Sequence, residues 1–203
     1  MSRILSIAVW SLAGLSVAAV AIVGGWVFYM RSIDQPAFQI VRKDGNIEIR
    51  DYGALTVAEV ARSGDRDSAV RAGFGPLARY IFAKDRQGEK IAMTVPVTQQ
   101  RRPDADTAWL VHFVMPEGKD ISSLPQPATE DVRLLTLPAT RRAVIRFSGR
   151  ANDQMIKSNE KRLLTWLEAE GYAINGPAVY AYYDDPLTPG VFRRNEVMYQ
   201  VKR

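Results

Sequence analysis

The feature that most constrains the fold of this chain is a diverged internal repeat. The Ser-Gly pair at residues 63–64 recurs at residues 148–149, 85 positions later. Each pair ends a stretch, residues 47–62 or 132–147, in which apolar and polar side chains alternate as in antiparallel strands. A helical stretch and two further strands follow each pair. The sequence therefore predicts an α+β fold of duplicated ββαββ units that form one curved antiparallel sheet or distorted β-barrel with two flanking helices.

Proline and glycine positions refine these expectations. The first helix is predicted over residues 68–82, and Pro76 should break or restart it because proline cannot donate a backbone hydrogen bond. Gly171 should end the second helix, residues 151–170, in a left-handed conformation. A strand is predicted over residues 90–99, and it should bulge or lie at an edge at Pro96. The other strands of the second half of each copy are predicted at residues 109–115, 178–183 and 196–202.

The N-terminal segment predicts a membrane anchor. Residues 4–30 carry no charged side chain, and a helix of that length spans about 40 Å, against about 30 Å of bilayer hydrocarbon. A cleaved signal peptide is the alternative, but its apolar core would be only about 7–15 residues long. We expect residues 1–35 to form an uncleaved anchor and tether, and residues 36–203 to form one domain outside the cytoplasm, which is the periplasm if the source is a bacterium.

Composition excludes several classes of function. The chain has no cysteine, which rules out disulfides, thiolate metal sites and cysteine nucleophiles, and its single histidine cannot build a two-histidine metal site. Of the net charge of +5, four charges belong to residues 36–203. The paired arginines are scattered without interleaved aromatic residues, so we expect no nucleic-acid binding. The positive charge suits anionic headgroups or an anionic ligand.

The first predicted helix offers a candidate binding surface. Arg71 and Arg79 lie eight residues apart, which places them near one face, with Gly75 and Ala78 between them and Phe74 at the border. Such a surface is a shallow floor of small residues edged by two cations. A flat apolar ring with two carboxylates would fit it, with its acids near the guanidinium groups. The alternative is that both arginines are simply solvated on an exposed face.

Three strings of residues carry a resemblance to a known family. KIAMTVPV at residues 90–97, FVMP at residues 113–116 and RRNEV at residues 193–197 make residues 37–203 resemble the SOUL family of heme-binding proteins. The resemblance implies a tetrapyrrole groove between the first helix and the loop before the last strand, which contains Leu187. It also implies that Arg71 and Arg79 bind propionates. The chain has Thr188 where the family would place a further basic residue.

His112 is the only imidazole available as an axial iron ligand. In the predicted strand at residues 109–115 it shares a face with Leu110 and Val114, and the family position that it matches is not a known ligand. A structural histidine is therefore the favoured interpretation. The methionines at positions 93, 115 and 198 are interpreted as core residues.

These features lead to three functional hypotheses. The first is a membrane-anchored binder or carrier of heme or a related porphyrin, without catalysis. The second is an enzyme acting on tetrapyrroles, for which Glu59, Glu196, Tyr180 and Tyr182 are the available acid–base groups. The third is a general apolar-ligand module such as the related GyrI-like domains, which share the duplicated architecture.

Overall fold

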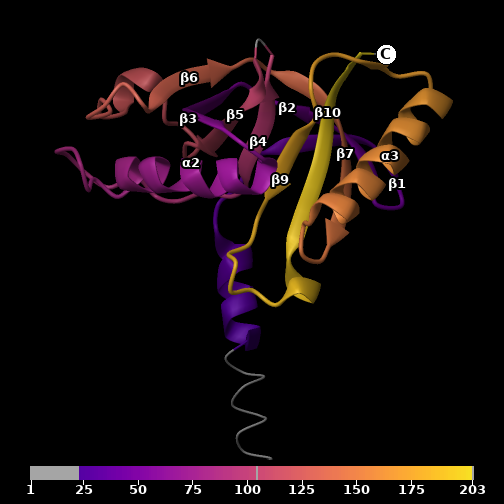
Figure 1. Ribbon diagram of the computed structural model, residues 1–203, viewed down its shortest axis with the longest axis horizontal. Helices are drawn as coiled ribbons and strands as arrows, with labels where there is room; N and C mark the ends of the chain where they lie inside the picture. The colour runs from indigo at the N-terminus through magenta and orange to yellow at the C-terminus, as the bar shows by residue number, and fades with distance from the viewer. Residues whose placement is uncertain (1–22, 104, 203) are drawn as a thin grey trace, which may run out of the picture. The chain divides into compact units, whose positions relative to one another are not determined.

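The computed structural model describes residues 23–103 and 105–202 (Figure 1). These residues fall into two compact units divided between Ile33 and Asp34. In the first unit, residues 23–32 are helical. Most of the predicted anchor, residues 4–30, lies outside the described residues. Within residues 23–103 and 105–202, none of the helices combines the length and apolar character that a membrane crossing requires.

The second unit contains two copies of the predicted ββαββ pattern. The first copy comprises β2 (Ile47–Tyr52), β3 (Leu55–Ser63), α2 (Arg66–Ile81), β4 (Val97–Arg102) and β5 (Ala105–Val114). The second comprises β6 (Arg133–Leu137), β7 (Thr140–Ser148), α3 (Asp153–Ala169), β9 (Val179–Tyr182) and β10 (Arg194–Lys202). The additional elements are β1 (Phe38–Asp44), β8 (Ala173–Ile174) and the 3₁₀ helices η1 (Ile121–Ser123) and η2 (Gly190–Phe192).

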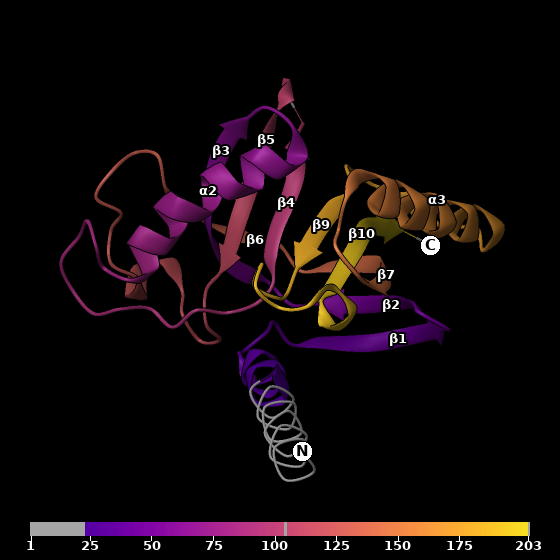
Figure 2. The ribbon, with the colours of Figure 1, turned by 60° about the horizontal axis from the view of Figure 1, so that its bottom comes forward.

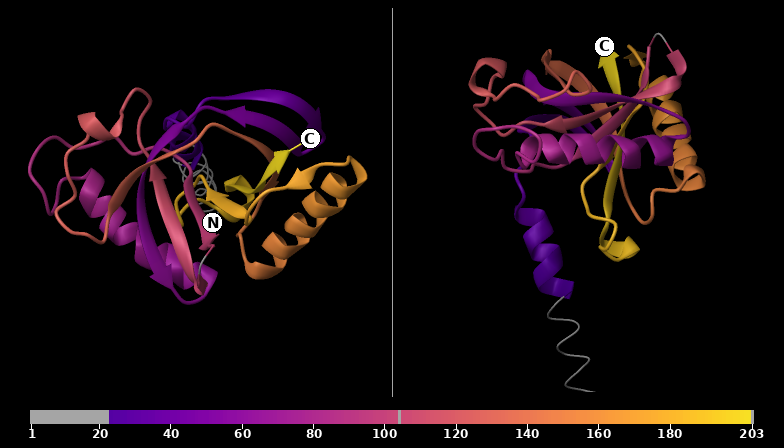
Figure 3. Two further views of the ribbon diagram at one scale, coloured as in Figure 1. Left: turned by 90° about the horizontal axis from the view of Figure 1, so that it is seen from above. Right: turned by 60° about the vertical axis from the view of Figure 1, so that its left-hand side comes forward.

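The strands form one antiparallel sheet in which the two copies exchange their first strands. The order is β1-β2-β7-β10-β9-β4-β5-β3-β6, and β8 pairs with β10 outside this path. Strand β2 of the first copy pairs with β7 of the second, and β6 of the second pairs with β3 of the first. The sheet curves strongly when seen from above (Figure 3, left). The predicted α+β architecture is confirmed.

Both helices pack on the same face of the sheet (Figure 2). Ile49, Ile145 and Val197 form one core with α3, while Val60 and Val111 belong to a second core with α2. Because side chains alternate along a strand, the intervening residues point to the opposite face, which we call the inner face. Strand β2 shows the consequence, since its first four residues, from Ile47 to Arg50, are all buried, the polar ones on the inner face.

Helix α2 is continuous through Pro76, so the predicted break is wrong. Proline leaves the carbonyl group four residues earlier, that of Ala72, without its usual donor. The structure supplies a substitute, because Nε of Arg62 donates to the Ala72 carbonyl at 3.3 Å. The Arg62 side chain is itself fixed by Asp131, with an Nη1–Oδ1 distance of 2.7 Å. The second helix ends as predicted, with Gly171 at a φ of +71°.

The strand predicted over residues 90–99 is shorter than expected, because residues 90–96 belong to no strand and β4 begins after Pro96. The backbone N–H of Val95 donates to the carbonyl of Asp34 at 2.9 Å, outside the sheet. Strand β4 also lies in the middle of the sheet, between β9 and β5. The expected bulge or edge at Pro96 is therefore wrong, and the proline precedes the strand.

Gly73 sets the distance between α2 and the sheet. A Cβ atom at this position would lie 2.8 Å from Cγ2 and 2.9 Å from Cβ of Val111. We predict that Gly73→Ala lowers the free energy of unfolding by about 1–3 kcal/mol, because the clash outweighs the gain in helix propensity. Urea denaturation of residues 34–203, which contain both cores, measures this change.

Gly75→Ala is the matched control in the same helix. A Cβ atom there would have only Nη1 of Arg79 nearby, at 3.7 Å. We expect this variant to be as stable as the parent or up to about 1 kcal/mol more stable. Equal effects of the two substitutions would contradict the close approach at Gly73.

Candidate functional site on helix α2

The start of α2 is fixed by side chains at its first residues. Asp65 caps the helix by accepting a hydrogen bond from the N–H of Ser68 at 2.8 Å. Arg66 is 7% exposed and donates to the hydroxyl of Tyr182 at 2.6 Å and to Oδ1 of Asp153 at 2.7 Å. These bonds join the start of α2 to β9 and to the first turn of α3. The helix therefore presents its outer face from a rigid support.

The five residues predicted on α2 all reach its surface. Arg71, Phe74 and Arg79 are exposed, and Gly75 and Ala78 are half-buried. Phe74 is 40% exposed and packs edge-on against Phe113 of β5, with ring centroids 5.2 Å apart. The aromatic ring is thus held in place by the core while part of its surface faces solvent.

The two predicted cations differ in their surroundings. The guanidinium group of Arg71 has no hydrogen bond or ion pair with another described residue, and its charge helps to lower the pKa of Asp65. Nε of Arg79 lies 2.7 Å from Oδ2 of Asp85 in a half-exposed ion pair. Its Nη1 lies 3.7 Å from the position that a Cβ atom would take at Gly75, an ordinary contact distance. A ligand carboxylate would have to compete with Asp85 for Arg79.

Leu187 does not join the residues of α2. It is 83% exposed on the loop between β9 and β10, which projects from the end of these strands, separate from α2 (Figures 1 and 3). The loop is well anchored, because Nε of Arg193 donates to the Thr188 carbonyl at 2.8 Å and the Gly149 N–H donates to the Gly190 carbonyl at 3.0 Å. The role of Leu187 in ligand binding stays a prediction.

His112 lies on the inner face and is 2% exposed. Its Nε2 is 2.8 Å from Oε2 of Glu59, and its Nδ1 is 3.4 Å from the hydroxyl of Thr98. The hydrogen bond from His112 lowers the pKa of Glu59 against the effect of burial. Both ring nitrogens therefore have partners inside the protein. Iron ligation by His112 would require these contacts to break, and the residue has the environment of a structural histidine.

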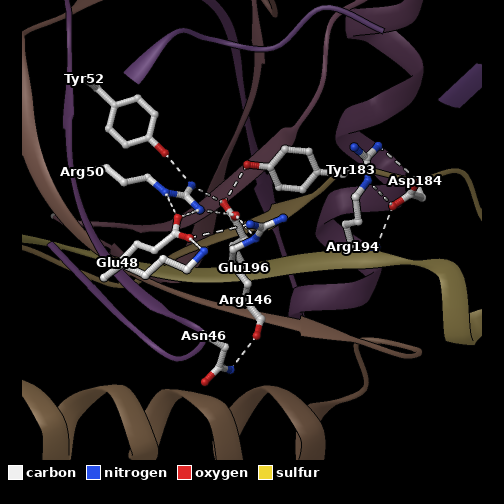
Figure 4. Close-up of polar contacts among 10 residues, drawn as sticks. Asn46, Glu48, Arg50, Tyr52, Arg146, Tyr183, Asp184, Arg194 and Glu196 are labelled. Atoms are coloured by element: carbon white, nitrogen blue, oxygen red, sulfur yellow. Dashed lines mark hydrogen bonds and ion pairs between the residues drawn. The ribbon is translucent and has the colours of Figure 1, made fainter. Parts of the chain in front are cut away.

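A buried charge cluster occupies the inner face next to β2 and β10 (Figure 4). Arg50 is 1% exposed and donates to Oε2 of Glu48 at 2.8 Å, to Oε1 of Glu196 at 2.9 Å and to the Tyr52 hydroxyl at 3.0 Å. The hydroxyl of Tyr183 donates to Oε2 of Glu196 at 2.6 Å. Burial acts to lower the pKa of Arg50, but the charge of Glu196 and its hydrogen bonds raise it. We call these five residues the Arg50 cluster.

Two cavities border the inner face. The smaller, of about 30 Å³, lies among Tyr52, Thr98, Val114, Tyr183 and Met198. The larger, of about 270 Å³, lies over Glu48 and Glu196. Neither holds a tetrapyrrole, since sites for drug-sized ligands occupy about 300–1,000 Å³. Both cavities are thus smaller than is usual for a ligand of that size.

Comparison with known proteins identifies the family. The model of the family described as SOUL heme-binding protein matches residues 33–200. The chain belongs to the SOUL heme-binding protein family. Heme-binding protein 2 of Mus musculus is 32% identical over 162 residues, which cover 75% of this chain and 77% of that protein. Heme-binding protein 2 of Homo sapiens is 31% identical over 162 residues, with the same coverage of both chains. The crystal structure of the EcmrR C-terminal domain matches with a TM-score of 0.60, at 12% identity, over 82% of this chain and 98% of that one, which shows a shared fold.

The SOUL-type motif RRNEV is part of the architecture rather than of the α2 surface. Arg194 pairs with Asp184, with its backbone N–H and Nε both bonded to Oδ2, and Nδ2 of Asn195 donates to the Gly149 carbonyl at 2.9 Å. Both contacts hold the motif to neighbouring loops. Glu196 differs, because its partner is Arg50, 146 positions away. Nothing in the local sequence of the motif signals that partner.

The four acid–base groups proposed from the sequence are not gathered at one place. Glu196 lies in the Arg50 cluster, and Glu59 is bound to His112. Tyr180 and Tyr182 pack against the α3 core on the opposite face. Burial raises the pKa of both tyrosines, and the neighbouring Glu160 raises that of Tyr180 further. Proton transfer by these four groups to one ligand would require a rearrangement of the sheet.

We predict that Arg50→Met lowers the free energy of unfolding by about 3–5 kcal/mol at neutral pH, because it leaves two buried carboxylates without their cation. In the wild type, hydrogen bonds from Arg50 and Lys43 hold the pKa of Glu48 low although burial acts to raise it. That stabilisation is present above the unfolded pKa of about 4.5 and is lost as the pH falls through the folded value. The deficit of the variant should therefore shrink in acid, which urea denaturation at several pH values measures.

Arg141→Met is the matched control, since Arg141 pairs with Asp51 at the surface of the neighbouring strand, with both side chains about 40% exposed. We expect its denaturation midpoint to stay close to that of the wild type. If Arg50→Met behaved like this control, the Arg50 cluster would not be a source of stability.

Proposed function

We propose that this SOUL-family chain binds heme or a related tetrapyrrole on the outer face of α2, as a carrier or buffer without catalysis. The family match over residues 33–200 supports the ligand class. The partly exposed ring of Phe74, held against the core at Phe113, supports the location and is the observation on which the proposal chiefly rests. The porphyrin ring would lie over Phe74, Gly75 and Ala78.

The charges on α2 suit a ligand with two carboxylates. Arg71 is exposed and has no competing ion pair among the described residues, so it would bind one propionate directly. Arg79 would bind the other in exchange for Asp85. Exposed ion pairs are worth about 1 kcal/mol or less, so that exchange costs little. His112 would not bind the iron of heme, because its imidazole is buried and both of its ring nitrogens have partners inside the protein.

The expected affinity is modest. Covering about 300 Å² of apolar ring at about 25 cal/mol per Å² gains about 7 kcal/mol, and association costs about 4 kcal/mol or more. The two solvent-exposed ion pairs of the propionates with Arg71 and Arg79 add about 1 kcal/mol each. The sum, about 5 kcal/mol, corresponds to a dissociation constant on the order of 100 μM or weaker. Such binding suits reversible transfer of a tetrapyrrole rather than its permanent retention for redox chemistry.

Titration of residues 34–203 with hemin, followed by its absorption spectrum, tests the proposal. We predict saturable binding with one ligand per chain and a dissociation constant raised about tenfold or more in the Arg71→Ala/Arg79→Ala variant. Metal-free porphyrin should bind with similar affinity, because no protein ligand to iron contributes. Asp85→Asn should tighten hemin binding, because it removes the competitor of Arg79.

Lys157→Ala/Lys161→Ala provides the matched control, since it removes two exposed cations from α3 instead. It should bind hemin like the wild type. Equal losses in the two double variants would indicate a nonspecific electrostatic effect, and unaltered binding in the α2 variant would place the site elsewhere. Loss of heme absorbance under reductant would contradict the absence of catalysis.

The proposal also includes attachment to a membrane through residues 4–30, with the binding domain outside the cytoplasm. The uncharged run in the sequence supports it. We predict that the full chain stays with membranes after alkaline carbonate extraction and that a chain beginning at residue 34 is released. Protease on the cytoplasmic side should leave the domain intact. Extraction of the full chain into the supernatant would contradict the anchor, and cleavage of the domain would reverse its orientation.

A further inference from the structure

The larger cavity of about 270 Å³ lies where the β1–β2 turn meets the end of β7 and the start of β10. Its lining includes Lys43, Asn46, Glu48, Arg146, Ser148 and Glu196. The two glutamates form its floor and are 2% and 4% exposed. Figure 4 shows Arg146 reaching over this floor toward both carboxylates. The cavity therefore has charged groups of both signs within reach of one small molecule.

The carboxylates of the floor are already saturated by protein donors. Glu196 accepts from Arg50 through both oxygens and from Tyr183 at 2.6 Å. Oε2 of Glu48 accepts from Arg50 at 2.8 Å, and its Oε1 faces Lys43 at 3.1 Å. A cationic ligand would have to displace buried partners to reach them. The floor is thus a poor site for a cation.

The cations at the rim are less fully engaged. Arg146 is 51% exposed and lies 3.5 Å from Glu196 and 3.8 Å from Glu48, distances longer than an ordinary charge-assisted hydrogen bond. Lys43 is 58% exposed and has one close contact, with Glu48. The hydroxyl of Ser148 has no hydrogen bond to another described residue. Several donors that line the cavity thus remain available to a ligand.

The charge balance sets the charge of that ligand. Three cations, Lys43, Arg50 and Arg146, face the two carboxylates of Glu48 and Glu196, which leaves one positive charge in excess. Arg194 at the edge of the cavity is paired with Asp184. One added negative charge would balance the site, whereas a second would be repelled by the buried carboxylates. A phosphate monoester, with a charge of about −1.5 to −2 at neutral pH, suits it less well than a carboxylate.

We propose that this cavity binds a single carboxylate group, held by the guanidinium of Arg146 and the ammonium of Lys43. Arginine recognises a carboxylate through two parallel N–H bonds, which the planar, half-exposed group of Arg146 can offer. The volume admits a short-chain monocarboxylate. It also admits the propionate arm of a tetrapyrrole whose ring lies outside, so the carboxylate has two sources that an experiment can separate.

The test is an amide NMR titration of residues 34–203 with sodium propanoate, against sodium chloride at equal ionic strength. We expect saturable shifts at Gly45, Asn46, Ser148 and Asn195, with a dissociation constant on the order of millimolar for so small a ligand. The affinity for propanoate should fall about tenfold in Arg146→Gln and also in Lys43→Gln. Arg133→Gln, at an exposed position on β6, should bind like the wild type. Circular dichroism and thermal melting establish that each variant is folded.

A second titration distinguishes the two sources. Hemin is added to the wild type and to Arg146→Gln: weaker hemin binding in the variant assigns the cavity to a propionate arm, and unchanged binding assigns it to a free small carboxylate. The proposal is overturned if the propanoate shifts do not saturate, if both rim variants bind propanoate like the wild type, or if inorganic phosphate binds as tightly as propanoate. The propanoate outcomes do not bear on the α2 site, which the Arg71 and Arg79 variants test. Weaker hemin binding in Arg146→Gln, in contrast, would place at least one propionate in this cavity instead of at Arg71 or Arg79.

Discussion

The interaction on which the structure depends is the pairing of one buried guanidinium, that of Arg50, with two buried carboxylates from strands far apart in the sequence. It joins β2 of the first copy to β10 of the second across the inner face. Transferring two carboxylates and a guanidinium from water into the protein costs free energy. This cost is offset because each nitrogen of the Arg50 guanidinium has a hydrogen-bond acceptor. Correct pairing of the two copies is therefore a condition for burying these charges at all.

The same cluster borders both cavities at the inner face. Tyr52 and Tyr183 of the cluster line the smaller cavity of about 30 Å³, and its two glutamates lie under the larger one of about 270 Å³. Outside the sheet, α2 offers a surface with an aromatic ring, small residues and cations, on which we propose that a flat macrocycle binds. We propose two kinds of recognition on separate surfaces: apolar stacking on the outside of α2, and carboxylate binding at the charged rim formed by Lys43 and Arg146.

Sequence patterns predicted the parts of the fold that depend on local periodicity. The repeat, the two helices and the left-handed Gly171 follow from alternation and from turn chemistry. The continuity of α2 could not be predicted, because it depends on Arg62 of strand β3, whose side chain replaces the hydrogen-bond donor lost at Pro76. The burial of Glu48 and Arg50 was missed for a similar reason, since alternating polar residues ordinarily indicate a solvated face. Likewise, the exposure of Arg71 and Arg79 followed from helical spacing, but the competition from Asp85 depends on how the chain turns after α2.

The exchange of first strands between the copies has an implication for the origin of this architecture. A lone ββαββ unit would have one strand with no neighbour to receive it, and two such units would satisfy each other in a twofold dimer. Joining them in one polypeptide replaces an encounter between molecules by a high effective concentration. Fused halves can also diverge, so that a surface such as the outer face of α2 need not be repeated on α3.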